Sequence, residues 1–433
     1  MRLDSLFVMV VWWLALMMTC VAGDAASKGV KNVLAFGGNG FIGSEVLDAL
    51  FTDPTQYYSV TLVSRGNWYF DSATRIKPKL HKTISCDRED SDLEFCTDLV
   101  TYIKETPRID IVLDFSAYNA AVMSASLDLL NEKGPDKVGV YVFISSDSIY
   151  EVCRGSATPR VAGEEDDKRP ESEEERNLLN EGDSYGNDKL ECEELLRGPG
   201  NKIPYLIFRL PDVLGARDTT DRWWTYQMWI EFYDFLKVPL LIPVENRKLK
   251  TSYVYVKDVA RAILLALNKP ESWKSVYNLG LEEPLTLQEF FERMAVAVRG
   301  QGREAVTFDT GEFNVFPSVS RGSVTIEKAK RVLEWEPSTW ETVFKETVPF
   351  YKEAFYKFTS ERDDASNQLT RFVVPRHRKG EFLRIIDELA ANPGISLDEH
   401  LATLGGGSND QGGGGSQVTP EQLFEEMMTR TEL

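Results

Sequence analysis

Short apolar runs alternate with longer stretches of helical periodicity between residues 31 and 150. The apolar runs predict strands at Asn32–Gly37, Val60–Ser64, Lys82–Cys86, Ile109–Phe115 and Val138–Ser145. Between them, apolar residues recur at helical spacing over Phe41–Phe51, Asp92–Lys104 and Ala120–Glu132. Strands that alternate with helices are typical of βαβ units, so we expect an α/β fold around a parallel sheet that binds ligands at the carboxyl ends of its strands.

After residue 200 the apolar runs become shorter and polar residues interrupt them more often. The pattern predicts strands at Tyr205–Gly215 and Ser252–Lys257 and helices at Val259–Leu267, Leu287–Val298, Ile326–Leu333 and Trp340–Phe358. We therefore expect a doubly wound parallel sheet in a dinucleotide-binding domain over residues 31–215. A smaller C-terminal α/β lobe, interleaved with the sheet, is expected over residues 216–358, followed by a charged helical extension over residues 359–404.

Both ends of the chain carry targeting features. The 13 apolar residues Leu6–Met18 are too few for a membrane span, and Ala22 and Gly23 offer a cleavage site, so residues 1–23 are interpreted as a signal peptide; an uncleaved anchor is the alternative. Residues 405–416 form a Gly/Ser linker, and a short helix is expected within residues 417–433. The final Arg430-Thr-Glu-Leu433 is similar to a retrieval signal, which predicts the lumen of the endoplasmic reticulum and a retrieval receptor, or secretion if the signal is not read. No membrane span is expected after cleavage.

Charge and cysteine usage narrow the function. The formal net charge of −19 argues against nucleic-acid binding, which requires clustered Lys and Arg. Cys86, Cys96, Cys153 and Cys192 lack the spacing of a zinc site, and the three histidines are scattered, so no metal is expected. An oxidising compartment would permit disulfides without fixing which cysteines pair. The acidic stretch 164–183 has no apolar stripe and is interpreted as a solvated loop, with a docking or calcium-buffering surface as the alternative.

A glycine-rich turn follows the first predicted strand and opens a helix. Gly37 allows the tight turn, Gly40 lets the backbone approach a pyrophosphate, and Gly43 permits close packing of the helix. The start of the helix, with Phe41 and Ile42 between the glycines, offers unpaired N–H groups to an anion. The turn therefore predicts a dinucleotide-binding site.

A second motif adds acid–base chemistry. Tyr185 and Lys189 are four residues apart and would share one face of a helix. A free tyrosine has a pKa near ~10, and a nearby ammonium favours its phenolate. The pair therefore predicts a proton-transfer site that operates beside the bound dinucleotide.

The turn Gly37–Gly43 resembles that of the extended short-chain dehydrogenase/reductases, the NAD-dependent epimerase/dehydratase family. The similarity covers residues 31–358, including Phe208–Gly215, Tyr253–Ala260 and Thr325–Pro337. By this resemblance, several positions would bind the cofactor: Gly37, Gly40, Phe41, Ile42, Gly43, Arg65, Asp87, Ser116, Ala117, Tyr185 and Lys189. Arg65 stands where an arginine accommodates the 2′-phosphate of NADP, so NADP is expected, with NAD as the alternative. Asp87 resembles the residue that contacts adenine.

The resemblance also implies a catalytic set. Ser146 matches the serine after the fifth strand and would hydrogen-bond the substrate oxygen. Tyr185 would move the proton as hydride passes to or from the nicotinamide. Lys189 would lower the pKa of Tyr185 and hold the ribose hydroxyls. Relatives often pair through the helix that carries the tyrosine, which implies a homodimer.

The sequence departs from the family pattern in places that concern the substrate. The segment between Ser146 and Tyr185 is long and acidic, and Tyr118 and Asp147 are bulkier or more charged than usual. Thr251 stands where sugar-nucleotide epimerases carry an arginine for the diphosphate, which leaves Lys250 and Arg247 as substitutes. These departures argue against a nucleotide-diphosphate sugar and resemble atypical members, including stem-loop-binding plastid proteins.

The function expected from these features is that of an NAD(P)-dependent oxidoreductase or epimerase/dehydratase. Its substrate would be a small hydroxyl or carbonyl compound, such as a sugar derivative. One alternative is a sensor that binds NAD(P) without turnover, and a second is an interaction protein of the endoplasmic reticulum lumen.

Overall fold

The computed structural model describes residues 29–88, 96–155, 159–300, 305–395 and 399–400. The predicted signal peptide, the Gly/Ser linker, and the last helix with its retrieval-like end lie outside the described residues. Residues up to Phe382 form one compact unit, and a second unit begins at Leu383. Among the described residues, no helix combines the length and the apolar character that crossing a bilayer requires.

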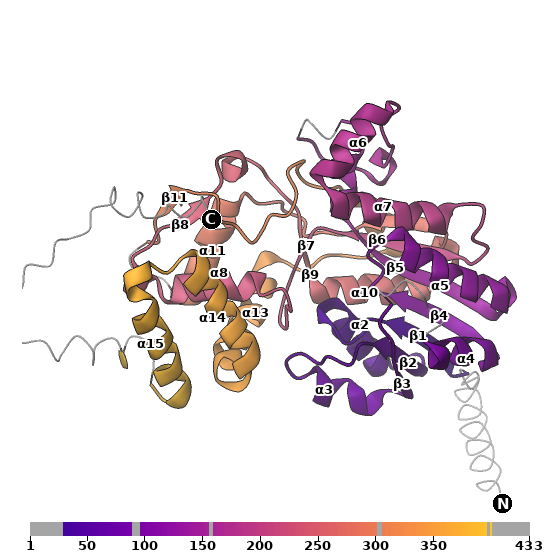
Figure 1. Cartoon of the computed structure of the whole chain (residues 1–433), viewed down its shortest axis with the longest axis horizontal. Helices are drawn as coiled ribbons and strands as arrows, with labels where there is room; N and C mark the ends of the chain where they lie inside the picture. Colours follow the sequence, from indigo (N-terminus) through magenta and orange to yellow (C-terminus); the bar gives the residue numbers. More distant parts are fainter. Residues whose placement is uncertain (1–28, 89–95, 156–158, 301–304, 396–398, 401–433) are drawn as a thin grey trace, which may run out of the picture. The chain divides into compact units, whose positions relative to one another are not determined.

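A seven-stranded parallel sheet forms the centre of the first unit, in the order β10-β6-β5-β4-β1-β2-β3 (Figure 1). Its strands are β1 (Lys31–Phe36), β2 (Tyr58–Ser64), β3 (Lys82–Ser85), β4 (Ile109–Asp114), β5 (Val138–Ser146), β6 (Tyr205–Leu210) and β10 (Ser275–Asn278). The chain runs outward from β1 to β3 and then returns to β4 on the other side of β1. The prediction of a doubly wound α/β fold is confirmed, and the reversal places a ligand-binding crevice at the carboxyl ends of β1 and β4.

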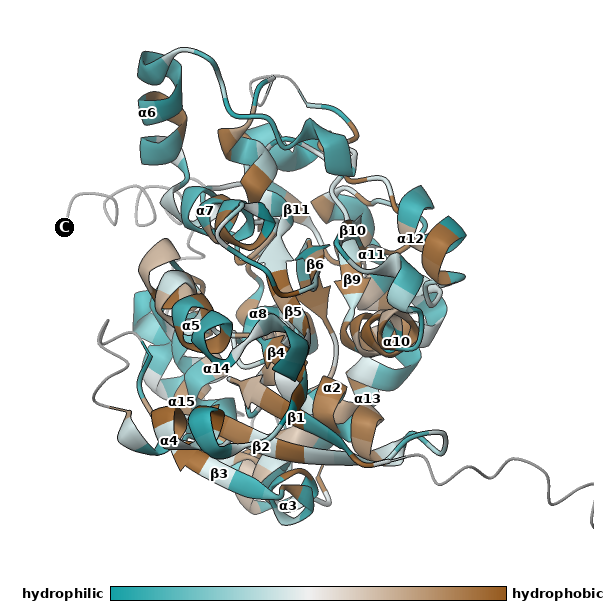
Figure 2. Ribbon diagram, turned by 90° about the vertical axis from the view of Figure 1, so that its right-hand side faces the viewer, coloured by the Kyte–Doolittle hydropathy of each residue, from teal (hydrophilic) through white to brown (hydrophobic). Residues whose placement is uncertain are grey.

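Both faces of the sheet are buried, and alternate residues of β1 show why. Val33 and Ala35 pack with α2 (Phe41–Thr52) and α10 (Val256–Leu267), whereas Leu34 and Phe36 pack on the opposite face. That opposite face is covered by α4 (Thr97–Glu105), α5 (Ala120–Lys133) and α7 (Ser184–Arg197). Figure 2 shows the resulting hydrophobic character along β1 and α10. Parallel strands buried on both sides have nearly continuous apolar sequences, which is why they could be predicted.

The remaining segments of the first unit form the smaller lobe and the connections between strands. The helices in these segments are α3 (Ser72–Arg75), α6 (Glu173–Gly182), α8 (Arg222–Glu231), α9 (Tyr233–Leu236), α11 (Leu287–Arg299), α12 (Glu327–Leu333), α13 (Trp340–Lys357) and α14 (Thr359–Phe372). Helix α15 (Lys379–Ala391) begins in the first unit and ends in the second. Two small parallel sheets pair β7 (Asp212–Leu214) with β9 (Tyr253–Tyr255) and β8 (Leu240–Ile242) with β11 (Phe308–Thr310). Short 3-10 helices are η1 (Lys77–Lys79), η3 (Pro135–Lys137), η4 (Asp147–Val152), η5 (Glu164–Asp166), η6 (Val244–Arg247), η7 (Pro270–Ser272) and η8 (Arg376–Arg378).

The acidic stretch 164–183 is not the solvated loop that its charge predicted. It begins with η5 and ends with α6, and although α6 is largely exposed, Glu164 and Asp167 are buried. The cause is Arg209, a completely buried residue of β6 whose Nη2 donates to Asp167 at 2.8 Å. Arg197 lies 2.5 Å from the same carboxylate. A buried guanidinium requires counter-charges, and the acidic segment supplies one of them.

Candidate active site

A cavity of about 800 Å³ opens at the carboxyl ends of β5 and β6. The nucleotide-binding side contributes Phe41, Ile42 and Tyr118, and the smaller lobe contributes a wall around Arg222 and Asn314. Ser146, Tyr185 and Lys189 also line this cavity. The structure thus brings the three residues predicted to be catalytic to one place, although they come from different elements.

Local structure fixes the positions of Ser146 and Tyr185. Ser146 ends β5, and its Oγ accepts a hydrogen bond from the backbone of Ser148 at 3.1 Å, which caps η4. Tyr185 lies in the first turn of α7, where Asp183 caps the helix by accepting from the Gly186 amide at 2.8 Å. Ser146 acts to lower the pKa of the Tyr185 phenol. The serine and the tyrosine thus line the same cavity and influence each other.

Lys189 lies one helical turn after Tyr185 and is only 2% exposed. Its Nζ donates to the carbonyl oxygens of Ala117 at 2.9 Å and Ile144 at 3.0 Å. It also lies 4.9 Å from the ring centre of Tyr118 and 5.8 Å from that of Tyr185. Two of the three ammonium donors are thus used by the protein, which leaves one for a ligand.

The electrostatic surroundings act on these groups in different ways. Burial lowers the pKa of Lys189 to about 8, because removal from water disfavours the ammonium. The pKa of Tyr185 is raised above its ordinary value, first by burial and then by Tyr118 and Asp147, although Ser146 and Arg222 act to lower it. The side chain of Tyr185 is nevertheless 44% exposed, so it can meet a ligand. Lys189 alone therefore does not produce the low tyrosine pKa that the family resemblance implied.

Asp147 is a candidate functional residue that the sequence analysis treated only as a departure from the family pattern. It is 3% exposed, its Oδ1 lies 3.5 Å from Ser146 Oγ, and its Oδ2 has no hydrogen-bond partner among the residues that the structure describes. Burial, followed by the charges of Asp212 and Glu151, raises its pKa well above the ordinary carboxyl value. The raised pKa favours the protonated form of this carboxyl group, which lies beside Ser146 just behind the lining of the cavity. The only sequence signal is an acidic residue directly after a buried strand.

The glycine-rich turn has the geometry of a phosphate cradle. Gly37 has a φ of +73°, and a Cβ at Gly43 would lie 2.5 Å from the Cα of Gly38. Gly40 caps α2 without a side-chain hydrogen bond, and no acidic residue lies in the first turn. The amides at the start of α2 are thus open to an anion, and the residues fit the diphosphate of a dinucleotide.

The other predicted cofactor residues surround this turn. A Cβ at Gly37 would lie 2.8 Å from the Cβ of Ser116, so the loop after β4, which also carries Ala117, packs against the turn. Arg65 and Asp87 follow β2 and β3, and both side chains are about half exposed. Arg65 Nη1 lies 3.9 Å from Asp87 Oδ2. The structure therefore places the two residues predicted to contact the adenosine part of the cofactor next to each other.

The expected substitutes for a diphosphate-binding arginine do not face the cavity. Thr251 is fully buried and pairs with Leu285 through its backbone. Lys250 forms an ion pair with Glu289 at 3.3 Å, and Arg247 donates to Thr310. The described lining of the cavity includes neither cation and instead carries Glu245 and Asn246 in this region. The interpretation of Lys250 or Arg247 as a diphosphate clamp is therefore wrong for this structure.

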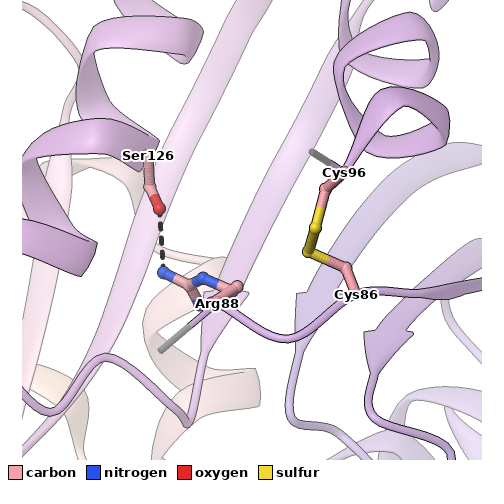
Figure 3. The surroundings of a disulfide bond; sticks show 4 residues. All are labelled: Cys86, Arg88, Cys96 and Ser126. Atoms are coloured by element: carbon pink, nitrogen blue, oxygen red, sulfur yellow. Dashed lines mark hydrogen bonds between the residues drawn. A yellow bond between two sulfur atoms is a disulfide. The ribbon is translucent and has the colours of Figure 1, made fainter. Parts of the chain in front are cut away.

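A disulfide joins Cys86, which follows β3, to Cys96, which precedes α4 (Figure 3). Their Cα atoms are 5.6 Å apart. Cys153 and Cys192 are buried free thiols. The sequence left this pairing open. Among the described residues, no group of three or more His, Cys, Asp or Glu side chains could hold a metal ion.

Comparison with known families gives a match over residues 33–280 to a family described as the NAD dependent epimerase/dehydratase family. The chain belongs to that family. It is thus an NAD-dependent enzyme of the extended short-chain dehydrogenase/reductase type. The family match spans the glycine-rich turn, Ser146, Tyr185 and Lys189, and it ends with β10.

Individual members of the family show how far the similarity extends. The dTDP-D-glucose 4,6-dehydratase of Mus musculus is 23% identical over 351 residues, which cover 76% of this chain and 90% of the mouse protein. The structure of dTDP-glucose 4,6-dehydratase from Bacillus anthracis in complex with NAD has a TM-score of 0.58 at 18% identity, covering 76% of this chain and 99% of the bacterial one. The structure of UDP-glucose 4-epimerase from Thermotoga maritima with UDP-glucose has a TM-score of 0.55 at 21% identity, covering 75% of this chain and 99% of the Thermotoga one. At these identities the structures establish a shared fold.

Proposed function

We propose that this protein is an NAD(P)-dependent epimerase or dehydratase of a sugar derivative, in which Ser146, Tyr185 and Lys189 assist hydride transfer. The observation that carries the proposal is the convergence of these three side chains on one cavity of about 800 Å³. Similarity to a dTDP-D-glucose 4,6-dehydratase and a UDP-glucose 4-epimerase supports a substrate that contains a sugar, although the substrates in both names also carry a diphosphate.

The chain's own residues divide the work of such a reaction. The turn Gly37–Gly43 would hold the diphosphate of the dinucleotide, which supplies the hydride acceptor when bound. Tyr185 would take the proton from a substrate hydroxyl, and Ser146 would hydrogen-bond the same oxygen. Lys189 would use its remaining N–H donor for the ribose hydroxyls, while the carbonyls of Ala117 and Ile144 hold it in place.

Asp147 bears on whether the enzyme also eliminates water from the oxidised substrate. Burial and the charges of Asp212 and Glu151 raise its pKa and so favour the protonated form, and its Oδ1 lies 3.5 Å from Ser146 Oγ. Elimination of water requires an acid to protonate the leaving hydroxyl, and Tyr185 is already assigned to the hydroxyl that is oxidised. A second acid beside Ser146 would distinguish a dehydratase, which eliminates water, from an enzyme that only transfers hydride.

The charge of the cavity bears on the substrate. Acidic side chains line it at Glu151, Asp183, Asp212, Asp218 and Glu245, and burial raises the pKa of Asp183, Asp212 and Asp218. In the described lining, the cationic side chains are Lys189, which is held by carbonyl oxygens, and Arg222, whose Nη1 lies 2.5 Å from Asp212 Oδ1. A nucleotide diphosphate would bring two further negative charges into this acidic space. We therefore propose a sugar derivative without a diphosphate as the substrate.

The cofactor preference and the cellular location are further proposals. The exposed Arg65 after β2 supports NADP, because a guanidinium pairs with a 2′-phosphate, whereas the similar structure from Bacillus anthracis holds NAD. Residence in the lumen of the endoplasmic reticulum is supported by the disulfide Cys86–Cys96, since disulfides persist in oxidising compartments. Retrieval would depend on the terminal Arg430-Thr-Glu-Leu433.

The first test is titration of the protein with NADPH and NADH, followed by protein fluorescence, for the wild type, Arg65→Asp and Tyr185→Phe. We expect tight NADPH binding that Arg65→Asp weakens and that Tyr185→Phe leaves intact. Sugars and nucleotide sugars would then be screened for turnover, which Tyr185→Phe should abolish. If neither dinucleotide binds, the enzyme proposal and the sensor alternative both fail, and an interaction protein remains. Low-micromolar binding of UDP-glucose or dTDP-glucose would contradict the proposed substrate class.

A further inference from the structure

A buried ion pair lies at the carboxyl ends of β3 and β4, next to the predicted cofactor turn. The guanidinium of Arg88 holds the carboxylate of Asp114 through two hydrogen bonds of 2.9 Å, Nη1 to Oδ1 and Nη2 to Oδ2. Arg88 is 6% exposed and Asp114 is fully buried. Arg88 also donates to Ser126 at 2.8 Å (Figure 3) and lies 3.9 Å above the ring of Phe36. Both charged groups are thus held in a single arrangement.

Asp114 also shapes the loop that follows it. Its Oδ1 accepts hydrogen bonds from the backbone amides of Ser116 at 3.0 Å and Ala117 at 2.9 Å. Arg88 Nη1 lies 3.2 Å from the hydroxyl of Ser116, and donates to it. The carbonyl of Ala117 is one of the two oxygens that accept from Lys189 Nζ. An unbroken series of hydrogen bonds therefore runs from Arg88 through Asp114 and Ala117 to Lys189.

We propose that Arg88 and Asp114 are positioning residues, which hold the Ser116–Ala117 loop and, through it, Lys189 in the arrangement that the reaction at Tyr185 requires. A buried ion pair is a weak source of stability, because desolvation offsets most of its attraction and apolar residues often serve as well. A role in stability alone therefore does not account for its place beneath this loop. The consequence for catalysis rests on the proposed function, whereas the effect on Lys189 does not.

The two members of the pair act on Lys189 with opposite signs. The carboxylate of Asp114 acts to raise the pKa of Lys189, and the guanidinium of Arg88 acts to lower it. Other groups around the ammonium are the thiol of Cys192, the carboxylate of Glu193 and the rings of Tyr118, Phe143 and Tyr185. Removing Arg88 should make Lys189 hold its proton to higher pH, and removing the charge of Asp114 should make it release the proton at lower pH.

Because Arg88 and Asp114 shift the pKa of Lys189 in opposite directions, their effect on the lysine can be tested without a substrate. In full-length protein labelled with ¹³C-lysine, the Lys189 signal would be assigned by its absence from Lys189→Arg and titrated in the wild type, Arg88→Met and Asp114→Asn. We expect the midpoint to move to higher pH in Arg88→Met and to lower pH in Asp114→Asn. The control is Arg75→Met, which breaks an ion pair with Glu45 elsewhere in the fold and should not move the signal. Midpoints that move in the same direction, or not at all, would overturn the proposal.

A second variant separates positioning from stability. The double change Arg88→Met with Asp114→Leu replaces the pair by apolar side chains, which should keep the protein folded even if a single change does not. Asp114→Leu also removes the acceptor of the Ser116 and Ala117 amides and of the Tyr141 hydroxyl, so Tm should fall, and a cooperative unfolding transition would show that the variant is still folded. Its turnover should fall by roughly tenfold to a hundredfold, because the loop that presents one of the two carbonyl acceptors of Lys189 is no longer held. Unchanged turnover in a folded double variant would contradict the positioning role. If the wild type shows no turnover, the proposed function fails, and the lysine titration still decides the role of the pair.

Discussion

Arg209 and Glu193 are both completely buried, and Arg209 holds the carboxylate of Glu193 through Nε at 2.9 Å and Nη2 at 2.6 Å. This contact joins β6 to the helix that carries Tyr185 and Lys189. Arg209 also donates to the hydroxyl of Tyr150 at 2.9 Å and to Asp167 at 2.8 Å. The position of α7 thus depends on a guanidinium in the sheet as well as on apolar packing.

Arg209→Met should therefore destabilise the protein strongly near neutral pH. It leaves buried carboxylates without their partner, which costs about 3–5 kcal/mol. Burial acts to raise the pKa of Asp167, but the hydrogen bonds and charges of Arg209 and Arg197 together lower it to about 2. A lowered carboxyl pKa stabilises the fold above about pH 4, and this contribution is lost as pH falls toward 2. Urea unfolding should show a large difference at neutral pH that shrinks in acid; an equal difference at both pH values would contradict this account.

Gly186→Ala should separate α7 from the serine-bearing loop. A Cβ at Gly186 would lie 2.3 Å from the carbonyl oxygen of Ser148, so the helix has to move away from η4. Because Tyr185 precedes Gly186, its alignment with Ser146 should be lost. We expect turnover to fall by about a hundredfold. Gly200→Ala is the matched control, since a Cβ there meets nothing within 4 Å, and kinetic assays should show wild-type turnover for it.

Asp221→Asn should stabilise the protein at neutral pH. Burial, followed by Asp218, Asp364 and Glu361, raises the pKa of Asp221 from 3.8 to about 7. The stability associated with its proton is fully present below about pH 4 and is lost as pH rises through 7. Asp221 also has a φ of +56°, which asparagine tolerates. We expect a gain of about 1–2 kcal/mol at pH 7, allowing for partial exposure, and little gain near pH 4.

Thermal unfolding at the two pH values checks the behaviour of Asp221. Asp128→Asn, at an exposed position of α5, is the control and should leave Tm unchanged at both. A gain from Asp221→Asn that is equal at pH 4 and pH 7 would show that backbone conformation, and not ionisation, is responsible.

Loss of the disulfide should lower stability without changing the fold. Cys86 and Cys96 are separated by 10 positions, and a cross-link of that span contributes about 3 kcal/mol by restricting the unfolded chain. We expect Cys96→Ser to lower Tm, and reductant to lower the Tm of the wild type by a similar amount. Reductant should have no effect on the variant; a further fall there would show that another process contributes.

The sequence predicted the parts of the fold whose signals are local. Four of the first five strands are rich in apolar residues, whereas β3 is short and has one buried residue, Ile84. The spacing of Gly37, Gly40 and Gly43 has meaning because it follows a strand. β10 was missed because its four residues, Ser275–Asn278, are no more apolar than many surface segments. α8 was missed because Trp223–Ile230 are all buried, so the helix has no polar face to produce a period.

The site was predictable only in part, for a related reason. Tyr185 and Lys189 are close in sequence, and the family pattern adds Ser146. The partners of Asp147 and the pairing of Arg88 with Asp114 depend on residues that only the folded sheet brings together. The net charge could not show that Glu164 and Asp167 are buried, because their partners are distant in the chain: Arg209 donates to the Asp167 carboxylate and the Asn278 amide donates to that of Glu164.

Because β10 comes late in the sequence, its position affects how the chain folds during synthesis and which fragments of it are stable. Its residues Ser275–Asn278 pair with β6 only after the chain has passed through α8, α9 and α10. A fragment ending at residue 215 would leave the backbone of β6 as an open edge, available for pairing with other chains. Truncated products of this length are therefore expected to aggregate rather than to survive as independent nucleotide-binding domains, and the nascent chain would need protection until β10 has left the ribosome.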